Sequence, residues 1–592
     1  MYFLLILLKA FVLPLSSQPI LVLGDSSERA YPERTSSSVL ISSEEIDALN
    51  VNRVDELLRQ TRGIQLQGNG AFGKATSFFI RGTDSRHTLV LIDGVRSTDV
   101  TAIGGGSRLE FLNTEDIEEI EILKGSQSVL YGSEAIGGVI KIKTRSGKAD
   151  SRKTRLNFGV GSFGRRSGSF VTSIPKEKFN IKIFGKVEDV EGYSAFNENK
   201  VPIADDDGYG NQEIGLRIDG VLGTVKSSIG VDRVQSQSEF DDNNGDNTSN
   251  KSEFQQTRSH LLLSKQFNDV FKMDLFISTQ AIERDILSSG TKYLYKGNFS
   301  RYELLNTVQL FKGELKVGAV FEQERVKSLG SKLRQTKKRD QSSAYSNYYK
   351  KMGIFFGEAG LRLVNNQFFD NTRVYRVGLG LKLSDIVSLK ASHATGFKSP
   401  SLFQNFGTFG GNIDLKPENS RSNEVSILFS KDNLEIEASI FENKIKNFID
   451  YDSTTNNYLN FGSFLNRGYE ASFQTEQESL SLKGSYTFLN SRDLRSGAYL
   501  ARRARHIGKI DLDFKLTSPF HLGIGVQYVG KREEPTGEIM PRYVIPSLRG
   551  SYNSRIGKFL LSIGNLVDKD YEEVRNFPMP GLNFNLSYNI EV

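Results

Sequence analysis

The sequence predicts a transmembrane antiparallel β-barrel of about 22 strands, with an N-terminal α+β plug domain inside its lumen. Three observations predict this fold: apolar and polar residues alternate along residues 149–592, only residues 1–15 are strongly apolar, and the mean hydropathy is −0.36. A membrane helix needs about 20 consecutive apolar residues. Strands with one apolar and one polar face cross a membrane without raising the mean hydropathy.

The composition excludes several classes of site. The chain of 592 residues has no cysteine, so disulfides, thiolate metal sites, iron–sulfur clusters and cysteine nucleophiles are excluded. Its 76 basic and 70 acidic residues give a net charge of +6. Because a chain so close to neutrality implies no concentrated basic face, a nucleic-acid partner is not expected.

The N-terminus is predicted to be a signal peptide over residues 1–17. Residues 1–15 read MYFLLILLKAFVLPL, which has the length of a signal-peptide apolar region, and Ser16 and Ser17 form a candidate cleavage zone. The segment departs from the usual pattern because its only base is Lys9. The alternative is an N-terminal strand or helix of a cytosolic protein. Export leaves two classes open, a soluble exported protein and a membrane barrel.

Residues 18–39 are predicted to be an extended linker that begins with a short apolar segment. Residues 25–38 (DSSERAYPERTSSS) are polar and rich in turn formers. The apolar segment before them can add as an edge strand to a partner protein; it consists of Ile20, Leu21, Val22, Leu23 and Gly24. The alternative is residual hydrophobicity of the signal peptide, which a cleavage site after Leu23 would favour.

Residues 40–148 are predicted to form a compact α+β unit. Ser42 and Glu45 make a capping box for a first helix, and Asn52 can cap a second helix that ends before Gly63. Four strand-like segments follow, at residues 77–81, 88–93, 117–123 and 138–144.

Residues 149–592 are predicted to form the barrel. Period-two alternation places apolar side chains on one face of each strand, most clearly in residues 582–592. Long polar loops are expected at residues 191–211, 235–256 and 330–340. A soluble sandwich of this length would need several cores, whereas a closed barrel turns its apolar face to lipid and has no open edges. A barrel of about 22 strands leaves an open lumen, so the α+β unit is interpreted as its plug.

Residues 68–73 match the pattern G-x-G-x-x-G of dinucleotide-binding sites. Such a site needs a helix directly after the glycines. Residues 74–81 (KATSFFIR) instead alternate like a strand. A mobile glycine-rich loop between two strands is the better interpretation.

The chain resembles the TonB-dependent outer-membrane receptors. Four stretches resemble the plug of that family: FIRG at 79–82, LVLIDGVR at 89–96, IEILKG at 120–125 and VLYGSEAIGGVI at 129–140. Four stretches are similar to its barrel: GFKSP at 396–400, LKPE at 415–418, NLVDKDY at 565–571 and PMPG at 578–581. The resemblance covers roughly residues 20–592. It implies that the segment from Ile20 to Gly24 is the TonB box and that the inner-membrane TonB complex is a partner.

Within this family the sequence is most similar to the cobalamin receptors, through residues 80–96, 133–139 and 500–505. This resemblance implies that plug loops at 69–77 and 97–107 contact the ligand. The residues carried over by position are Asn69, Lys74, Thr76, Ser77, Ile103 and Gly104. Lys74, Ala75 and Ile103 depart from the small polar or amide residues that cobalamin receptors have there. A ferric siderophore or another metal chelate is therefore the alternative ligand.

Two further groups of residues are candidates for ion pairs and for calcium binding. Arg81 and Glu121, on plug strands, are candidates for plug–barrel ion pairs that break reversibly; static contacts within the plug are the alternative. Two acidic loops offer carboxylates for Ca²⁺, which similar receptors bind in their early outer loops; the candidates are Asp205, Asp207, Asp241 and Asp242. A solvated acidic loop is the alternative. No covalent cofactor is expected.

The sequence offers no catalytic motif, and none of its five histidines lies between Pro400 and Leu415, where a haem receptor of this family would place a ligand. The expected function is active import of a scarce, large ligand across the outer membrane of a diderm bacterium. A passive porin or adhesin and a soluble exported hydrolase are the other classes considered. Outer-membrane lipid and the barrel-assembly machinery are further expected partners, and the chain is expected to be monomeric.

Overall fold

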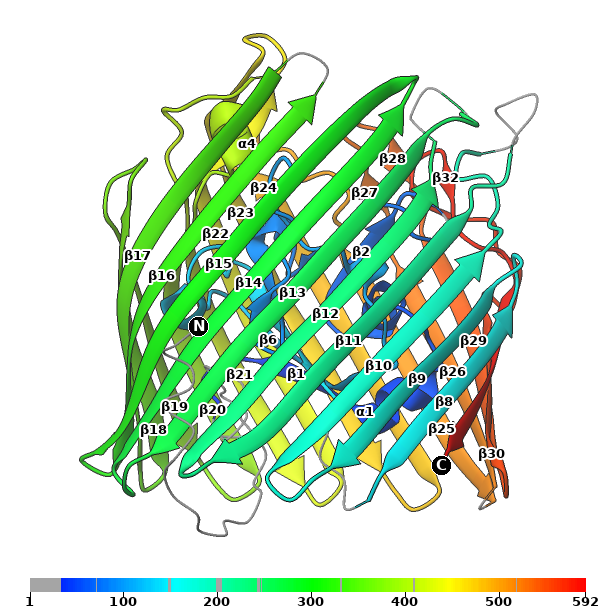
Figure 1. Cartoon of the computed structure of the whole chain (residues 1–592), viewed down its shortest axis with the longest axis horizontal. Coiled ribbons are helices and arrows are strands. Elements are labelled where there is room, and N and C mark those ends of the chain that lie inside the picture. The colour runs from blue at the N-terminus through cyan, green and yellow to red at the C-terminus, as the bar shows by residue number, and fades with distance from the viewer. Residues whose placement is uncertain are drawn as a thin grey trace.

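A computed structural model of the chain describes residues 34–70, 72–146, 151–197, 205–241, 245, 247–330, 333–407, 410–517 and 519–592. The predicted signal peptide at 1–17 and the segment from Ile20 to Gly24 lie outside the described residues. The described residues form a closed barrel of 22 strands around an N-terminal α+β domain, the plug (Figure 1). The predicted fold class is therefore confirmed. Among these residues, no helix is long and apolar enough to cross a membrane.

The barrel strands pair with their neighbours in chain order, and β33 closes the ring by pairing with β8. Their bounds are β8 Lys153–Gly161, β9 Arg166–Pro175, β10 Phe179–Val190, β11 Tyr209–Leu222, β12 Val225–Glu239, β13 Lys251–Gln266, β14 Phe271–Ser288, β15 Thr291–Leu310, β16 Gly313–Gly330, β17 Leu333–Met352, β18 Phe355–Asn366, β19 Thr372–Lys382, β20 Val387–Lys398, β21 Glu418–Lys431, β22 Leu434–Asp452, β23 Asn457–Glu476, β24 Leu480–Asp493, β25 His506–Thr517, β26 Phe520–Val529, β29 Tyr543–Ser554, β30 Gly557–Gly564 and β33 Asn583–Glu591.

The alternation along each strand sorts side chains between the outer surface and the lumen. On β11, Ile214 is 60% exposed on the outer surface, whereas Arg217, three residues further on, is only 8% exposed and lies in the lumen. This arrangement inverts that of a soluble protein, because the apolar face is the one without protein contacts. The outer surface therefore suits a hydrocarbon solvent, and the lumen suits polar contacts with the plug.

The two ends of the barrel differ in the length of their connections. Residues 223–224 join two strands at one end, and residues 191–208 join two strands at the other. Short turns face the periplasm and long loops face outward in outer-membrane barrels. The loop expected at 330–340 is wrong, since β17 begins at Leu333.

The plug contains a five-stranded sheet in the order β1-β6-β7-β4-β5 and a separate hairpin, β2–β3. Its elements are β1 Ser38–Ser42, α1 Ser43–Leu49, α2 Val54–Gln60, β2 Ile64–Gly68, β3 Thr76–Ile80, η2 Ser85–His87, β4 Thr88–Ile92, β5 Val95–Arg96, η3 Leu109–Phe111, β6 Ile117–Lys124, α3 Ser128–Tyr131 and β7 Gly138–Thr144. Short elements in the outer loops are α4 Leu402–Phe406, β27 Arg532–Glu533, β28 Ile539–Met540, β31 Glu572–Val574 and β32 Phe577–Pro578.

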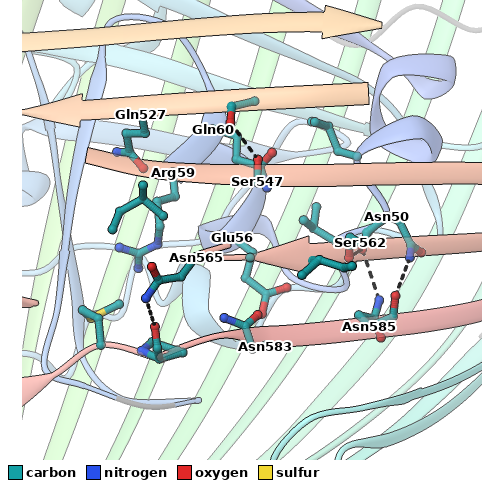
Figure 2. Close-up of a pocket in the computed structure, with 18 of the residues that line it drawn as sticks. Asn50, Glu56, Arg59, Gln60, Gln527, Ser547, Ser562, Asn565, Asn583 and Asn585 are labelled. Atoms are coloured by element: carbon teal, nitrogen blue, oxygen red, sulfur yellow. Dashed lines mark hydrogen bonds between the residues drawn. The ribbon is translucent and has the colours of Figure 1, made fainter. Parts of the chain in front are cut away.

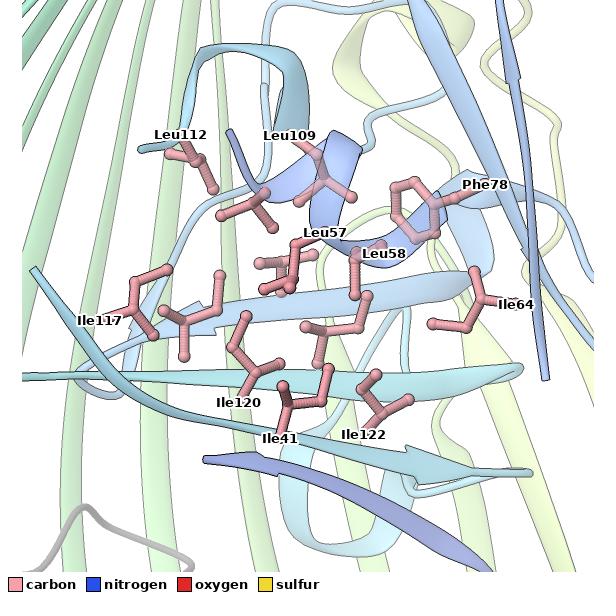
Figure 3. Close-up of a cluster of buried hydrophobic side chains, with 14 of the residues drawn as sticks. Ile41, Leu57, Leu58, Ile64, Phe78, Leu109, Leu112, Ile117, Ile120 and Ile122 are labelled. Atoms are coloured by element: carbon pink, nitrogen blue, oxygen red, sulfur yellow. The ribbon is translucent and has the colours of Figure 1, made fainter. Parts of the chain in front are cut away.

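The plug has its own hydrophobic core, in which α1 and α2 pack on the sheet (Figure 3). Leu57 and Leu58 of α2 are completely buried there, and each contributes roughly 1.5–3 kcal/mol by leaving water. The expected cap of α1 is present, because the Ser42 hydroxyl accepts a hydrogen bond from the Glu45 amide at 3.4 Å. The Asn52 cap is wrong: α2 is capped by Arg53 without a side-chain bond. The Asn52 amide instead donates to Ser167 of the barrel at 3.4 Å.

Candidate functional site

The face of the plug that points toward the long loops carries two exposed segments. The first is the loop of the β2–β3 hairpin, whose strands pair in antiparallel register up to Gly68 and Thr76. No helix follows the glycines, so the loop between two strands predicted from residues 68–73 is confirmed. Gly73 adopts φ +68, and a Cβ there would overlap the ring of Tyr209 on β11. Glycine is therefore needed where this loop lies against the barrel wall.

The candidate ligand residues of this loop differ in accessibility. Asn69, Thr76 and Ser77 are partly exposed. Lys74 is only 4% exposed, and its ammonium donates to the carbonyl of Asp207 at 3.3 Å. Burial lowers the pKa of Lys74 to about 8, while the nearby carboxylates oppose that shift. Lys74 thus lies beneath an outer loop, and a ligand reaches it only if that loop moves.

The second segment is the loop at residues 97–107. Ile103 at its tip is 51% exposed, and its carbonyl accepts a hydrogen bond from Ser401 at the start of α4. Gly104 lies against the side chain of Arg86. The base of the loop is held by Asp99, whose carboxylate pairs with Arg284 of β14 at 3.1 Å. The loop is therefore anchored to the barrel at its base and presents an apolar tip.

Two arginines that were given no role from the sequence lie between these loops. Arg86 and Arg503 both approach the carboxylate of Asp84, at 3.6 and 3.5 Å. Their guanidinium groups stack on Phe448 and Phe79, at 4.2 and 4.1 Å from the ring centroids. Although burial opposes ionisation, the two arginines lower the pKa of Asp84. One carboxylate thus faces two guanidinium groups, which can bind an anionic group of a ligand, while Glu418 and Asp450 add negative charge near Arg86.

A sequence signal for this pair existed. Arg86 and Arg503 lie in the two stretches, 80–96 and 500–505, that carry the resemblance to cobalamin receptors. The sequence does not show that the two stretches approach the same carboxylate, because Arg503 and Asp84 are 419 positions apart.

The two candidate ion-pair residues make different contacts. Arg81 of the plug is buried and pairs with Glu424 of β21 at 2.9 Å and with Glu470 of β23 at 3.0 Å. Lys124 of the plug also reaches Glu470, at 3.0 Å. Glu121 pairs with Arg34 at 2.6 Å and with Lys141 at 2.7 Å. Arg81 thus links the plug to the barrel wall, whereas these pairs of Glu121 lie on the plug side.

The candidate calcium ligands are partly brought together. The carboxylate of Asp207 accepts from the Ala195 amide at 2.7 Å, and that of Asp241 accepts from the Phe196 amide at 2.8 Å. Burial and contact with Asp241 raise the pKa of Asp207 to about 7. Asp205 lies in the same loop as Asp207, Asp241 lies in the connection between β12 and β13, and Asp242 lies outside the described residues.

Ca²⁺ takes six to eight oxygen ligands. Among the described residues, no group of three or more acidic or histidine side chains is arranged to hold a metal ion. Asp207 and Asp241 would supply two carboxylates, and the remaining ligands would be other oxygens, such as backbone carbonyls, amide side chains or water. Calcium in the outer loops stays a prediction.

A domain fastened inside a closed barrel, with a ligand-facing surface toward the long loops, defines a gated receptor of the outer membrane. Comparison with known proteins agrees. Residues 148–566 match the family described as TonB dependent receptor-like, beta-barrel, and residues 31–139 match the TonB-dependent receptor plug domain. The chain belongs to the TonB-dependent receptors, a family of transporters in the outer membrane of Gram-negative bacteria. It functions in TonB-dependent import.

The similar proteins include receptors that are named for two kinds of ligand. The chain is 28% identical to the vitamin B12 transporter BtuB of Vibrio vulnificus over 576 residues, covering 91% of this chain and 90% of the relative. It is also 28% identical to the vitamin B12 transporter BtuB of Vibrio cholerae serotype O1, covering 95% and 93%. Among solved structures, the siderophore receptor PirA of Acinetobacter baumannii has a TM-score of 0.83 at 18% identity, covering 94% and 98%. The ferric enterobactin receptor PfeA of Pseudomonas aeruginosa has a TM-score of 0.81 at 17% identity, covering 95% and 100%.

Proposed function

We propose that this receptor imports cobalamin. The observation that carries the proposal is the similarity to vitamin B12 transporters at 28% identity over nine tenths of the chain or more. The siderophore receptors align at 17–18% identity, a level at which they support the fold alone. The ligand would bind on the face formed by the loops at 69–77 and 97–107, with residues Asn69, Thr76, Ser77, Ile103 and Gly104 as first contacts.

The chemistry of this face suits a large ligand that is uncharged over most of its surface and carries one anionic group. The segment from Asn69 to Ser77 offers amide and hydroxyl groups, and Ile103 offers an apolar tip. Arg86 and Arg503 share Asp84, so they can pair with a phosphodiester such as the one in the nucleotide loop of cobalamin. A ferric siderophore is the alternative ligand, because a strongly anionic chelate would use the same two arginines.

Import would be driven by the inner-membrane TonB complex, which would bind the segment from Ile20 to Gly24. That segment precedes β1, the first strand of the plug, so a pull on it acts on the plug directly. Arg81, paired with Glu424 and Glu470, would act as a static contact that holds the plug to this part of the barrel wall during transport. Asp207 and Asp241, together with other oxygen ligands, would bind calcium and order the outer loops.

The test uses cells that lack their own cobalamin receptor and express either this chain or a variant without Ile20–Gly24. We expect saturable uptake of labelled cyanocobalamin by the intact receptor, and binding without uptake by the deletion variant. Uptake that survives the deletion would indicate a passive pore. A chain that binds and imports a ferric siderophore but not cyanocobalamin would make the alternative ligand correct.

A further inference from the structure

Two cavities lie between the plug and one side of the barrel wall. The upper cavity, of about 210 Å³, is enclosed by α1, α2 and the β2–β3 loop on the plug side and by β25, β26, β29, β30 and β33 on the barrel side (Figure 2). The lower cavity, of about 470 Å³, is lined by β1, α1 and the end of α2, facing β23 to β26, β29 and β30.

The strand register shows that the two cavities are stacked along the barrel. β25 runs from the long-loop end to the short-turn end; its Lys509 lines the upper cavity and its Lys515 lines the lower one. β29 runs the same way, with Ser547 in the upper cavity and Ser551 in the lower one. The residues that line both cavities form a neck between them, and they are Leu49, Gln60, Lys509, Asp511 and Arg549.

The neck is closed by hydrogen bonds from the barrel to the end of α2. The ammonium of Lys509 donates to the carbonyl oxygens of Arg59 and Ile64, at 2.6 and 3.2 Å, and also to that of Thr61. A lysine in this position caps the free carbonyl groups of a helix C-terminus. Arg549 holds Asp511 at 2.9 Å and reaches the side-chain oxygen of Gln60 at 3.5 Å. These bonds break if the end of α2 moves away from the wall.

A second fastening lies at the end of α1. The side-chain amide of Asn50 donates to the carbonyl of Asn585 on β33 at 3.2 Å, and that of Asn585 donates to the carbonyl of Asn50 at 3.1 Å. Ser562 of β30 donates to the same carbonyl of Asn50 at 3.2 Å (Figure 2). The opposite wall holds the plug through the buried charges of Arg81, Glu424 and Glu470. The side with the cavities is held by the hydrogen bonds at the end of α1, by the cap at α2 and by two ion pairs, Glu45 with Lys483 of β24 at 2.7 Å and Arg59 with Glu573.

The order of elements along the chain shows how a pull reaches this side. A force that arrives from the N-terminal side first acts on Thr35 and Ser37, which bind Glu358 of β18 and Glu424 of β21 on the opposite wall. It then acts on β1, the edge strand of the plug sheet, which pairs with β6 over the five residues from Ser38 to Ser42. α1 follows without a loop, and its last residue, Leu49, lies in the neck.

Besides apolar side chains and the charged Arg165, Lys509, Asp511 and Arg549, the barrel wall of the upper cavity carries neutral polar groups. Six of them are Gln527, Ser547, Ser562, Asn565, Asn583 and Asn585 (Figure 2). Amides and hydroxyls exchange hydrogen bonds with a ligand that carries amide side chains, and they do so without the strong attraction of a buried charge. The roof of the cavity includes Gly70 and Phe72, which belong to the candidate ligand loop. A ligand bound at that loop therefore lies next to the entrance.

We propose that the ligand crosses the membrane between the plug and the wall formed by β25, β26, β29, β30 and β33. Withdrawal of β1 and α1 opens the neck and joins the two cavities, while the plug sheet stays fastened to the opposite wall. The upper cavity must widen for this, because 210 Å³ is below the roughly 300–1,000 Å³ of sites for small ligands. The proposed passage depends on the proposed function only for the identity of the ligand that passes, which is taken to be cobalamin.

The test compares two disulfide locks, since the chain has no cysteine of its own. The first lock, Asn50→Cys with Asn585→Cys, ties the end of α1 to β33 across the contact described above. The control lock, Ser126→Cys with Gly396→Cys, ties the plug to β20 on the opposite wall, where a Cβ on Gly396 would touch the Ser126 hydroxyl. Uptake and surface binding of labelled cyanocobalamin are measured for each pair, oxidised and then reduced.

We expect the oxidised first lock to bind cyanocobalamin and to import it at least tenfold more slowly, with recovery on reduction. The oxidised control lock should import at no less than half the rate of its reduced form. If both locks block import, the plug leaves the lumen as one body and the proposal is wrong. It is also wrong if the oxidised first lock imports normally. If the reduced proteins import ferric enterobactin and not cyanocobalamin, the ligand assignment fails, and the same comparison with ferric enterobactin still tests the passage.

A bulky side chain in the upper cavity provides a second test. Ser547→Trp should retain binding and lose uptake at least tenfold, because the indole occupies the cavity. The matched control is Val544→Trp on the same strand, where Val544 is exposed on the outer surface of the barrel. Normal uptake by Ser547→Trp would contradict the proposed passage.

Discussion

The buried charges around Arg81 support a quantitative prediction about how firmly the plug is held. Three bases (Arg81, Lys124, Lys390) face three acids (Glu424, Glu470, Glu437), and the Lys390–Glu437 pair measures 3.2 Å. Replacing Arg81 by methionine keeps an unbranched side chain at this residue, whose φ is +52. The change leaves one carboxylate unpaired in a buried site, which costs about 3–5 kcal/mol.

This cost should appear as faster opening of the plug next to Arg81. Since each 1.36 kcal/mol is a factor of ten, we expect amide hydrogen exchange in β3 to accelerate by roughly 100- to 5,000-fold. The measurement is hydrogen exchange of the receptor in detergent, followed by mass spectrometry. The double variant Arg81→Met with Glu424→Gln removes the unpaired charge and should recover at least half of the loss. Exchange within threefold of the wild type in the single variant, or faster exchange in the double variant, would refute this reasoning.

Three further predictions concern the ligand face and the plug core. Arg503→Gln should weaken ligand binding tenfold or more without changing the thermal unfolding of the barrel; unchanged affinity in a binding titration would remove Arg503 from the site. Burial raises the pKa of Glu110 to about 7, above its value in the unfolded chain, so the stability contributed by this group is present below about pH 4.5 and is lost as the pH rises to about 7. Glu110→Gln should therefore become more stable relative to the wild type as the pH rises from 5 to 8. If the melting temperatures of variant and wild type differ by the same amount at pH 5 and at pH 8, the raised pKa of Glu110 is contradicted. Gly138→Ala would place a Cβ 2.5 Å from the carbonyl oxygen of Leu123, so we expect a loss of roughly 1–3 kcal/mol in plug stability, measured by urea unfolding; a neutral effect would mean that the two strands separate easily.

The sequence predicts the barrel well because each strand carries its own signal. In residues 582–592, which contain β33, the alternation of apolar and polar residues indicates directly which side chains face lipid. The two edges that close the ring are a different matter, since the pairing of Asn585 with Gly161 joins the ends of the barrel domain and no local pattern encodes it. The same holds for Arg81: the sequence places it on a plug strand, which is wrong by one residue because β3 ends at Ile80 and Arg81 begins the turn, and its partners lie 343 and 389 positions away.

The elements that sequence reasoning missed are those whose structure comes from their neighbours. β1 has only three apolar residues, Val39, Leu40 and Ile41, between serine-rich flanks, a run too short to identify a strand, and it pairs with β6 along its whole length. Asn52 has the chemistry of a helix cap, yet α2 begins one residue later, so that Arg53 occupies the N-cap position, and the side-chain nitrogen of Asn52 donates to Ser167 of the barrel. Lys74 was expected on the ligand face, and the outer loop that contains Asp207 covers it.

The most direct test of the proposed function is a binding titration of the purified receptor in detergent. Cyanocobalamin and ferric enterobactin are titrated separately into the wild-type chain and into Arg503→Gln. We predict saturable one-site binding of cyanocobalamin at micromolar affinity or tighter, weaker binding by the variant, and no saturable binding of ferric enterobactin. Saturable binding of ferric enterobactin together with no heat from cyanocobalamin would contradict the assignment of cobalamin as the ligand.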